Sequence, residues 1–236
     1  SESRSLAGCH ALVTAGPTFE PIDPVRGITN SSSGKMGYAI AEALRDAGAN
    51  VVLVTGPTNL TAPTLVKTIA VRTSSEMFDA VKRNFTGIDL FFAVAAVADY
   101  TPANPQTQKI KKSGAPVTIE LSPTVDILAW VYSQNSGPFC VGFAAESENV
   151  IENARIKREK KRIPMIVANS ALQAIGSDNN MVTIVDDTGD HPIPQASKLH
   201  VARQVVAHAA KLFGASAIAG NARNKRDQTM GTEKNA

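Results

Sequence analysis

Short apolar runs alternate with amphipathic helical segments along the first two thirds of this 236-residue chain. Each apolar run has the length of one strand, and the segments between runs repeat their apolar residues at helical spacing. Strands that alternate with helices along a chain form a mostly parallel sheet with helices packed on it. The pattern therefore predicts an α/β protein whose parallel sheet is covered by helices on both faces.

The predicted strands are residues 11–14, 51–55, 65–71, 89–95, 117–121, 139–143 and 165–168. The predicted helices are residues 36–47, 75–85, 125–132, 149–161 and 197–213. Gly48 is the expected C-terminal cap of the first helix, and Ser74 or Ser75 is the expected N-cap of the second. Two short runs joined by a turn at residues 187–190 predict a small antiparallel hairpin near the C-terminus. We expect a Rossmann-like fold to which this hairpin is added.

We expect one domain over residues 9–213. From residue 214 to residue 236 the helical periodicity is lost, which predicts a flexible C-terminal tail. No run approaches the roughly 20 apolar residues that a membrane span needs. The polar residues 1–8 lack the apolar core of a signal peptide, and a net charge of +3 does not indicate nucleic-acid or membrane binding. These features predict a cytoplasmic protein.

The cysteines and histidines form no reactive or metal-binding motif in the sequence. Cys9 and Cys140 each lie in an apolar run, so we expect buried, reduced thiols without a disulfide. The four histidines are scattered, and His200 and His208 fit ordinary positions on the C-terminal helix. Neither a Ser-His-Asp nor a Cys-His arrangement is visible. We therefore expect the chemistry to proceed without a protein nucleophile.

The residues that follow the predicted strands are mostly small or hydroxylated, with a few acids. They are residues 15–18, 56–58, 95–100, 144–147 and 169–170. Ligands of open parallel sheets bind beyond the carboxyl ends of the strands, and small residues let a ligand approach the backbone closely. We expect a nucleotide crevice at this edge of the sheet.

Three polar features near this edge leave alternatives open. Residues 31–37 lead into a predicted helix, whose first N–H groups favour phosphate, but they lack a Walker or dinucleotide glycine pattern. They are therefore either a phosphate site or a plain N-capped helix. The lysines within residues 109–112 form either a solvent-facing strip or a mobile loop that brings an ammonium to a polyphosphate. Lys157 and Lys161 share one helix face and are either surface charges or nucleotide contacts.

Two further side chains have the chemistry for a site. Asp99 follows a buried run, where it either caps a turn, accepts hydrogen bonds from a ribose or holds Mg²⁺. Asn30 lies in the long first loop, four residues after Arg26. Its neutral amide suits a donor to a developing oxyanion.

Several of these segments together resemble one enzyme family. They are residues 14–18, 20–26, 29–37, 95–100, 109–112, 141–146 and 166–169, and residues 177–180 also fit. In order and spacing they resemble phosphopantothenoylcysteine synthetase over residues 9–213. The resemblance implies a ligase of coenzyme A synthesis that activates 4′-phosphopantothenate with CTP, through an acyl-cytidylate, and then joins it to cysteine.

The resemblance also implies a nucleotide, an ion and partners. CTP is the expected nucleotide, with ATP as the alternative, and Mg²⁺ is the expected ion. A homodimer is implied because the family's sites lie near a dimer interface, and bacterial members commonly carry this domain behind a flavin-dependent decarboxylase. Residues 122–126 read Ser-Pro-Thr-Val-Asp where many relatives have a Lys-Asn-Pro-Asp type of segment. The choice between CTP and ATP therefore stays open.

Residue roles follow from the same resemblance. Asn30 and Lys109 are the implied catalytic residues, and Asn30, Arg26 and Ala96 are the implied contacts of the substrate. The implied nucleotide-binding residues are Gly16, Ala93, Val94, Ala95, Asp99, Lys109, Ser122, Pro123, Thr124, Val125, Phe143, Lys157 and Lys161. The metal ligands stay unassigned.

Two rival interpretations start from the same sequence. An NAD(P)-dependent oxidoreductase needs a glycine fingerprint after the first strand, where Ala15-Gly16-Pro17 stands instead. A nucleic-acid-binding module would use the basic clusters at residues 109–112 and 157–162. Only 5% of the residues are aromatic, which is little for a protein that stacks bases. Neither rival is favoured.

Overall fold

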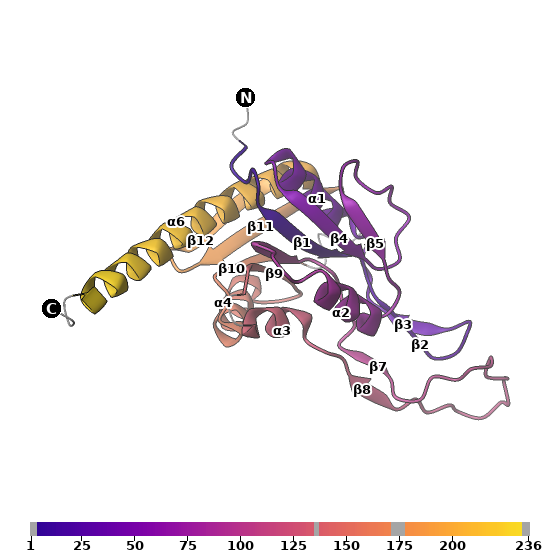
Figure 1. Ribbon diagram of the computed structural model, residues 1–236. Helices are drawn as coiled ribbons and strands as arrows, with labels where there is room; N and C mark the ends of the chain where they lie inside the picture. The colour runs from indigo at the N-terminus through magenta and orange to yellow at the C-terminus, as the bar shows by residue number, and fades with distance from the viewer. Residues whose placement is uncertain (1–3, 135–136, 171–177, 233–236) are drawn as a thin grey trace.

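The computed structural model describes residues 4–134, 137–170 and 178–232 of the chain. Within these residues an eight-stranded sheet has the order β12-β11-β10-β9-β6-β1-β4-β5 (Figure 1). The parallel strands are β1 (His10–Ala15), β4 (Asn50–Thr55), β5 (Lys67–Ala70), β6 (Leu90–Ala93), β9 (Phe139–Glu146) and β10 (Met165–Ser170). The predicted parallel sheet is therefore confirmed, with β1 between β4 and β6.

An antiparallel hairpin extends one edge of this sheet. β11 (Asn179–Asp186) pairs with β10 on one side and with β12 (Gly189–Ser197) on the other. The predicted hairpin is therefore confirmed. Because β11 reverses the strand direction, Asn180 lies near the carboxyl ends of the parallel strands and Asp186 lies at the opposite end of the sheet.

Helices cover both faces of the sheet. On one face lie α1 (Lys35–Asp46) and α6 (Lys198–Thr232), and on the other lie α2 (Ser74–Arg83), α3 (Ile127–Ser133) and α4 (Val150–Lys161) (Figure 1). Side chains alternate along each strand, so Val13 joins the core beneath the first pair and Leu12 joins the core beneath the other three. Burial on both faces explains why the parallel strands are almost continuously apolar. None of the described helices is long and apolar enough to cross a membrane.

Both cysteines are free thiols, as predicted. Cys140 is fully buried in β9, where burial raises the pKa of its thiol to about 12. Cys9 is only partly buried, and burial together with the charge of Asp89 raises its pKa. Both thiols are therefore protonated and poorly nucleophilic at neutral pH.

The first long loop contains a short antiparallel ribbon. β2 (Phe19–Pro21) pairs with β3 (Gly27–Thr29), and the turn between them encloses the buried Asp23. Asp23 Oδ1 accepts the backbone N–H groups of Val25 at 2.9 Å and of Arg26 at 2.8 Å. These bonds give the turn a defined shape although its residues are polar.

The predicted strand at residues 117–121 is wrong. A strand begins only at the last of these residues, where β8 (Leu121–Pro123) pairs with β7 (Tyr100–Pro102) outside the main sheet. Val117 and Ile119 alternate with polar residues, a pattern that indicates a strand with one buried face. Both side chains are exposed, so neither belongs to the core of this domain.

The start of α2 also differs from its prediction. The N-cap is Thr73, neither Ser74 nor Ser75. Thr73 Oγ1 accepts the N–H of Glu76 at 3.1 Å, and the Glu76 carboxylate accepts the N–H of Thr73 at 3.3 Å. Such a capping box needs Glu or Gln three residues after the cap, a spacing that Thr73 alone meets among the three candidates. At the end of α1, by contrast, Gly48 has φ +95°, as expected of a residue that closes a helix.

The last helix is longer than predicted. Its expected end is Phe213, whereas α6 continues to Thr232, and residues 233–236 lie outside the described part of the chain. Gly214 costs a helix only about 1 kcal/mol relative to Ala, and the alanines around it favour the helix. The lost periodicity therefore marks the end of the buried face rather than the end of the helix. That residues 214–236 form a flexible tail stays a prediction.

Replacing Thr73 by Ala is expected to lower the free energy of unfolding by about 1 kcal/mol, because the first turn of α2 loses its side-chain acceptor. Urea unfolding measures the change. Ser75→Ala is the matched control, since Ser75 is exposed and outside the capping box, and we expect its effect to be within about 0.5 kcal/mol of zero. Equal effects of the two substitutions would contradict the assignment of the cap.

Candidate functional site

A crevice opens at the carboxyl ends of β1, β6 and β9. It consists of two adjoining cavities of about 350 and 210 Å³, and the lining residues that they share are Ala95, Val97, Asp99, Phe143 and Lys157. A cavity of about 750 Å³ lies at the opposite end of the strands, beside Asp89 and Phe139. Open α/β sheets bind ligands at the carboxyl edge, so we assign the site to the smaller, continuous crevice.

The start of α1 lines the larger of the two cavities. Its N-cap is Gly34, in the left-handed region at φ +75°, and no side chain caps the helix. Whether residues 31–37 bind phosphate or form a plain N-capped helix stays a prediction. Residues 31–37 all line the cavity. The N–H groups of the first turn, with the helix dipole, are thus available to phosphate oxygens.

Asn30 lies in the crevice beside the segment that follows β6. Its amide nitrogen donates to Val97 O at 3.0 Å and to Ala96 O at 3.3 Å. The two implied substrate contacts Asn30 and Ala96 are therefore neighbours. Because both amide hydrogens point at carbonyl oxygens, a developing oxyanion must displace one of these bonds to use the amide as a donor.

Arg26 does not line the crevice. Its guanidinium donates to Asp23 Oδ2 from Nε at 3.0 Å and from Nη2 at 2.5 Å, and Nη2 also donates to Ile110 O at 2.7 Å. Asp23 Oδ2 accepts the N–H of Ile110 at 3.1 Å. The hydrogen bond from Arg26 is the main cause of the lowered pKa of Asp23, which keeps this carboxylate charged. Arg26 and Asp23 thus hold the backbone of the lysine loop.

Lys109 also lies outside the crevice of its own chain. Its side chain is exposed on the loop between β7 and β8, and Figure 1 shows this loop extending away from the sheet. The neighbouring Ile110 is the point at which Arg26 and Asp23 hold the loop. For Lys109 to reach a bound nucleotide, either the loop moves or the nucleotide belongs to a second chain.

Two lysines of α4, Lys157 and Lys161, line the crevice. Lys161 Nζ forms an ion pair with Asp126 at 2.9 Å, and Asp126 also caps α3 by accepting the N–H of Ala129 at 3.0 Å. Lys157 lines both cavities and, within the described residues, has no carboxylate at ion-pair distance. Burial, and then the charge of Lys161, lowers the pKa of Lys157. An anion in the crevice would offset this desolvated charge.

Most of the implied ligand contacts meet in the crevice. Those that line it are Asn30, Ala93, Val94, Ala95, Ala96, Asp99, Thr124, Val125, Phe143, Lys157 and Lys161. Gly16, Ser122 and Pro123 lie outside its lining. A Cβ on Gly34 would lie 3.3 Å from Gly16 Cα, so the lack of a side chain at Gly34 lets the start of α1 approach the end of β1.

Four amide or lysine side chains of the larger cavity have no individual role in the sequence analysis. Lys35, Asn169, Asn180 and Lys198 line the larger cavity. The first three lie within segments that carry the family resemblance, which was the available signal. Ser177, in the last of these segments, lies outside the described residues. Lys198 had no such signal, because it reaches the crevice only through the reversal of the chain in the hairpin and the start of α6.

A comparison with known families decides the assignment. The family described as DNA/pantothenate metabolism flavoprotein C-terminal domain matches residues 6–213. This chain belongs to that family. The match begins before β1 and ends within α6, so the family domain includes the whole sheet and every described residue of the crevice.

Curated relatives in this family carry one common name. The Coenzyme A biosynthesis bifunctional protein CoaBC of Haemophilus influenzae is 43% identical over 209 residues, which cover 87% of this chain and 52% of the relative. The protein of that name from Bacillus subtilis is 41% identical over 215 residues, or 89% of this chain and 53% of the relative. The chain therefore spans about half the length of these relatives.

A solved structure matches the domain along nearly its whole length. It is the crystal structure of the C-terminal domain of Coenzyme A biosynthesis bifunctional protein CoaBC, with a TM-score of 0.77 and 40% identity. The match covers 90% of this chain and 99% of that chain. The half of the relatives to which this family domain corresponds is thus the C-terminal half.

Replacing Lys157 by Met is expected to weaken nucleotide binding and to raise the free energy of unfolding at neutral pH. The pKa of Lys157 is lower in the folded protein than in the unfolded chain, so the charged side chain lowers the free energy of unfolding. This destabilisation is fully present below the folded pKa and is lost as the pH rises above the ordinary pKa of lysine. Loss of a charged hydrogen-bond donor should weaken binding about 10- to 100-fold. Calorimetric titration with CTP and urea unfolding at pH 7 measure the two effects.

Lys160→Met is the control for Lys157→Met. Lys160 lies on the same helix, and its exposed side chain is outside the crevice lining. Its substitution removes the same charge as Lys157→Met. We expect it to leave the affinity for CTP nearly unchanged. If both variants bound CTP as the unchanged protein does, the role of Lys157 would be refuted.

Proposed function

We propose that this chain is a phosphopantothenoylcysteine synthetase, which joins 4′-phosphopantothenate to L-cysteine in the synthesis of coenzyme A. The observation that carries the proposal is its 40% identity, over nearly the full domain, to the C-terminal domain of a coenzyme A biosynthesis protein. The crevice at the carboxyl edge supports the same function. Family membership goes against both the oxidoreductase and the nucleic-acid-binding interpretations.

The proposed reaction has two steps. The carboxylate of 4′-phosphopantothenate attacks the α-phosphorus of CTP, and pyrophosphate leaves to give an acyl-cytidylate. The amine of cysteine then attacks the acyl carbon, CMP leaves, and the amine loses a proton as the amide forms. No side chain acts as a nucleophile, in keeping with the two protonated cysteines.

The main physical obstacle is repulsion between a carboxylate and a triphosphate. Lys35, Lys157 and Lys198 line the crevice and offset this charge, together with the start of α1. Asn30 is the proposed donor to the oxyanion of the acyl-nucleotide, in exchange for one of its present bonds to carbonyl oxygens. These groups act on charge and position rather than through covalent bonds.

CTP and Mg²⁺ are part of the proposal. Thr124 and Val125 line the smaller cavity and are the proposed contacts of the cytosine base, with ATP as the alternative nucleotide. Mg²⁺ prefers one or two carboxylates together with phosphate oxygens. Asp99 fits that requirement, because it lines both cavities and forms no ion pair with another described residue. Bound Mg²⁺ would neutralise phosphate charge.

We also propose that the active form is a homodimer. Lys109 is exposed and outside the crevice lining, on a loop that extends away from the sheet and carries the exposed apolar residues Val117 and Ile119. A second chain would cover these side chains and accept the lysine near its bound nucleotide. The bifunctional relatives support a further proposal, that a flavin-dependent decarboxylase domain accompanies this domain in the cytoplasm.

The purified chain is expected to release CMP and pyrophosphate when CTP, 4′-phosphopantothenate, cysteine and Mg²⁺ are supplied together. Without cysteine we expect the reaction to stop at the bound acyl-cytidylate, so CMP should not accumulate. A parallel assay with ATP measures the nucleotide preference. Absence of CMP and AMP from all mixtures, with a folded protein, would refute the function.

Asn30→Asp and Lys109→Gln are expected to lower kcat about 100-fold or more, because each removes a donor or a cation from the transition state. Lys111→Gln is the matched control on the same loop and should keep most of the activity. Thermal unfolding should change little in Lys109→Gln and Lys111→Gln, since both side chains are exposed. Asn30→Asp also loses the bonds to Ala96 O and Val97 O, so we expect its unfolding temperature to fall modestly while the protein stays folded. Unchanged turnover of either catalytic variant would contradict its role.

A further inference from the structure

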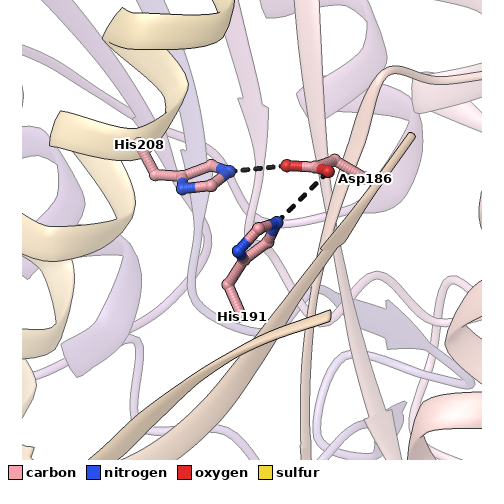
Figure 2. Close-up of side chains that lie close together, drawn as sticks. All are labelled: Asp186, His191 and His208. Carbon is pink, nitrogen blue, oxygen red and sulfur yellow. Dashed lines mark hydrogen bonds and ion pairs between the residues drawn. The ribbon is translucent and has the colours of Figure 1, made fainter. Parts of the chain in front are cut away.

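Two histidines and one carboxylate meet at the end of the sheet opposite the crevice (Figure 2). Asp186 is the last residue of β11, His191 lies in β12 and His208 lies in α6. Their potential ligand atoms all lie within 4.8 Å of one another. The sequence analysis missed this cluster because the residues come from three elements without a metal-binding spacing.

Hydrogen bonds direct both rings at the carboxylate. His208 Nε2 lies 2.6 Å from Asp186 Oδ2, and His191 Nε2 lies 3.3 Å from Asp186 Oδ1. Figure 2 shows one nitrogen of each ring pointing at the carboxylate group. The ring centroids are 4.6 Å apart, so the two imidazoles also touch each other. The donor atoms therefore converge on one small space.

The carboxylate is buried and charged. The side chain of Asp186 is 2% exposed, and burial acts to raise its pKa. Hydrogen bonds from Thr188 and His208 outweigh the burial and hold the pKa well below its usual range. Asp186 therefore presents its carboxylate to the two rings from a buried position.

A neighbouring residue orients the carboxylate. Thr188 donates to Asp186 Oδ1 from its backbone N–H at 2.7 Å and from its hydroxyl at 2.6 Å. These bonds leave Oδ2 directed at His208. Hydrogen bonds of this kind, from a second layer to a ligand, are typical of metal centres.

The other charged groups of this turn are already paired. Asp187 forms an ion pair with Arg158 at 2.8 Å, and Asp190 forms one with Arg155. Both arginines belong to α4, on the opposite face of the sheet from α6. These two arginines pair with Asp190 and Asp187 rather than with Asp186.

We propose that Asp186, His191 and His208 form a binding site for a divalent transition-metal ion of the Zn²⁺ type. Imidazole nitrogens and a carboxylate oxygen are common ligands of Zn²⁺, whereas Mg²⁺ prefers oxygen ligands alone. This site is therefore chemically distinct from a Mg²⁺ site in the crevice. The side chains of His191 and His208 are 38% and 21% exposed, which leaves an open side for a water molecule as the fourth ligand.

The distances fit such a site after a small adjustment. Metal–ligand bonds of about 2.0–2.1 Å in a tetrahedron put ligand atoms roughly 3.3 Å apart. His191 Nε2 lies at this separation from Oδ1, the carboxylate oxygen that Thr188 holds, whereas His208 Nε2 approaches Oδ2. The hydrogen bond between His208 and Asp186 must lengthen from 2.6 Å, which a change in the side-chain torsions of His208 supplies.

The site is too far from the crevice to take part in catalysis. Asn180 lines the crevice, and Asp186 follows six residues later on the same strand, about 20 Å away at the usual rise of a strand. A metal ion would cross-link β11, β12 and α6, the elements that bring Asn180 and Lys198 to the crevice. Its role is therefore to stabilise this part of the fold.

Calorimetric titration with Zn²⁺ after treatment with a chelator tests the proposal on the full chain. We expect binding of one Zn²⁺ ion per chain at this site, with roughly 100-fold or greater loss of affinity in His191→Gln and His208→Gln, since each removes a direct ligand. His200→Gln is the matched control, because His200 is exposed on the same helix and should leave the affinity unchanged. Anomalous diffraction at the zinc edge should give a peak between the three side chains.

A fourth variant keeps the test informative if a histidine substitution unfolds the protein. Thr188→Val retains every direct ligand and removes only the hydroxyl that orients Asp186, so Zn²⁺ affinity should fall about 10- to 100-fold. Equal Zn²⁺ affinity of the unchanged protein and the variants, or absence of binding at micromolar Zn²⁺, would overturn the proposal. The three residues would then form only a hydrogen-bonded contact between the hairpin and α6.

Discussion

The close approach of α1 to the end of β1 is the contact on which the crevice depends. A Cβ added to Gly37 would lie 2.4 Å from the Cβ of Ala15, and one added to Gly34 would lie 3.3 Å from the Cα of Gly16. Only small residues on both sides allow the helix to begin directly at the strand end. The N–H groups of its first turn therefore stay at the carboxyl edge of the sheet, where β6 and β9 also end.

Lysines around this edge carry an electrostatic cost that anionic ligands would relieve. Burial and the charge of Lys35 lower the pKa of Lys198, and burial and the charge of Lys161 lower the pKa of Lys157. A protein surface rarely keeps cations in such positions for stability alone. The arrangement suits the proposed reaction, whose difficulty is to bring two anions together.

The C-terminal hairpin joins two sites of different chemistry. One end of β11 brings Asn180 to the crevice, and the other end brings Asp186 to two histidines. Ion pairs from α4 and hydrogen bonds to α6 hold the turn from both faces of the sheet. The hairpin is therefore a structural bridge between the edge that binds ligands and the opposite end of the domain.

The sequence by itself determined the parallel sheet, its helices, the hairpin and the edge of the sheet at which a ligand is expected. These follow from local periodicity, since apolar spacing reports which face of an element is buried and parallel strands end at one edge. Only the tertiary structure decided that Arg26 holds the lysine loop, and that His191 and His208 meet. Such contacts depend on how elements distant in sequence pack together, and the spacing of residues within one element carries no record of that.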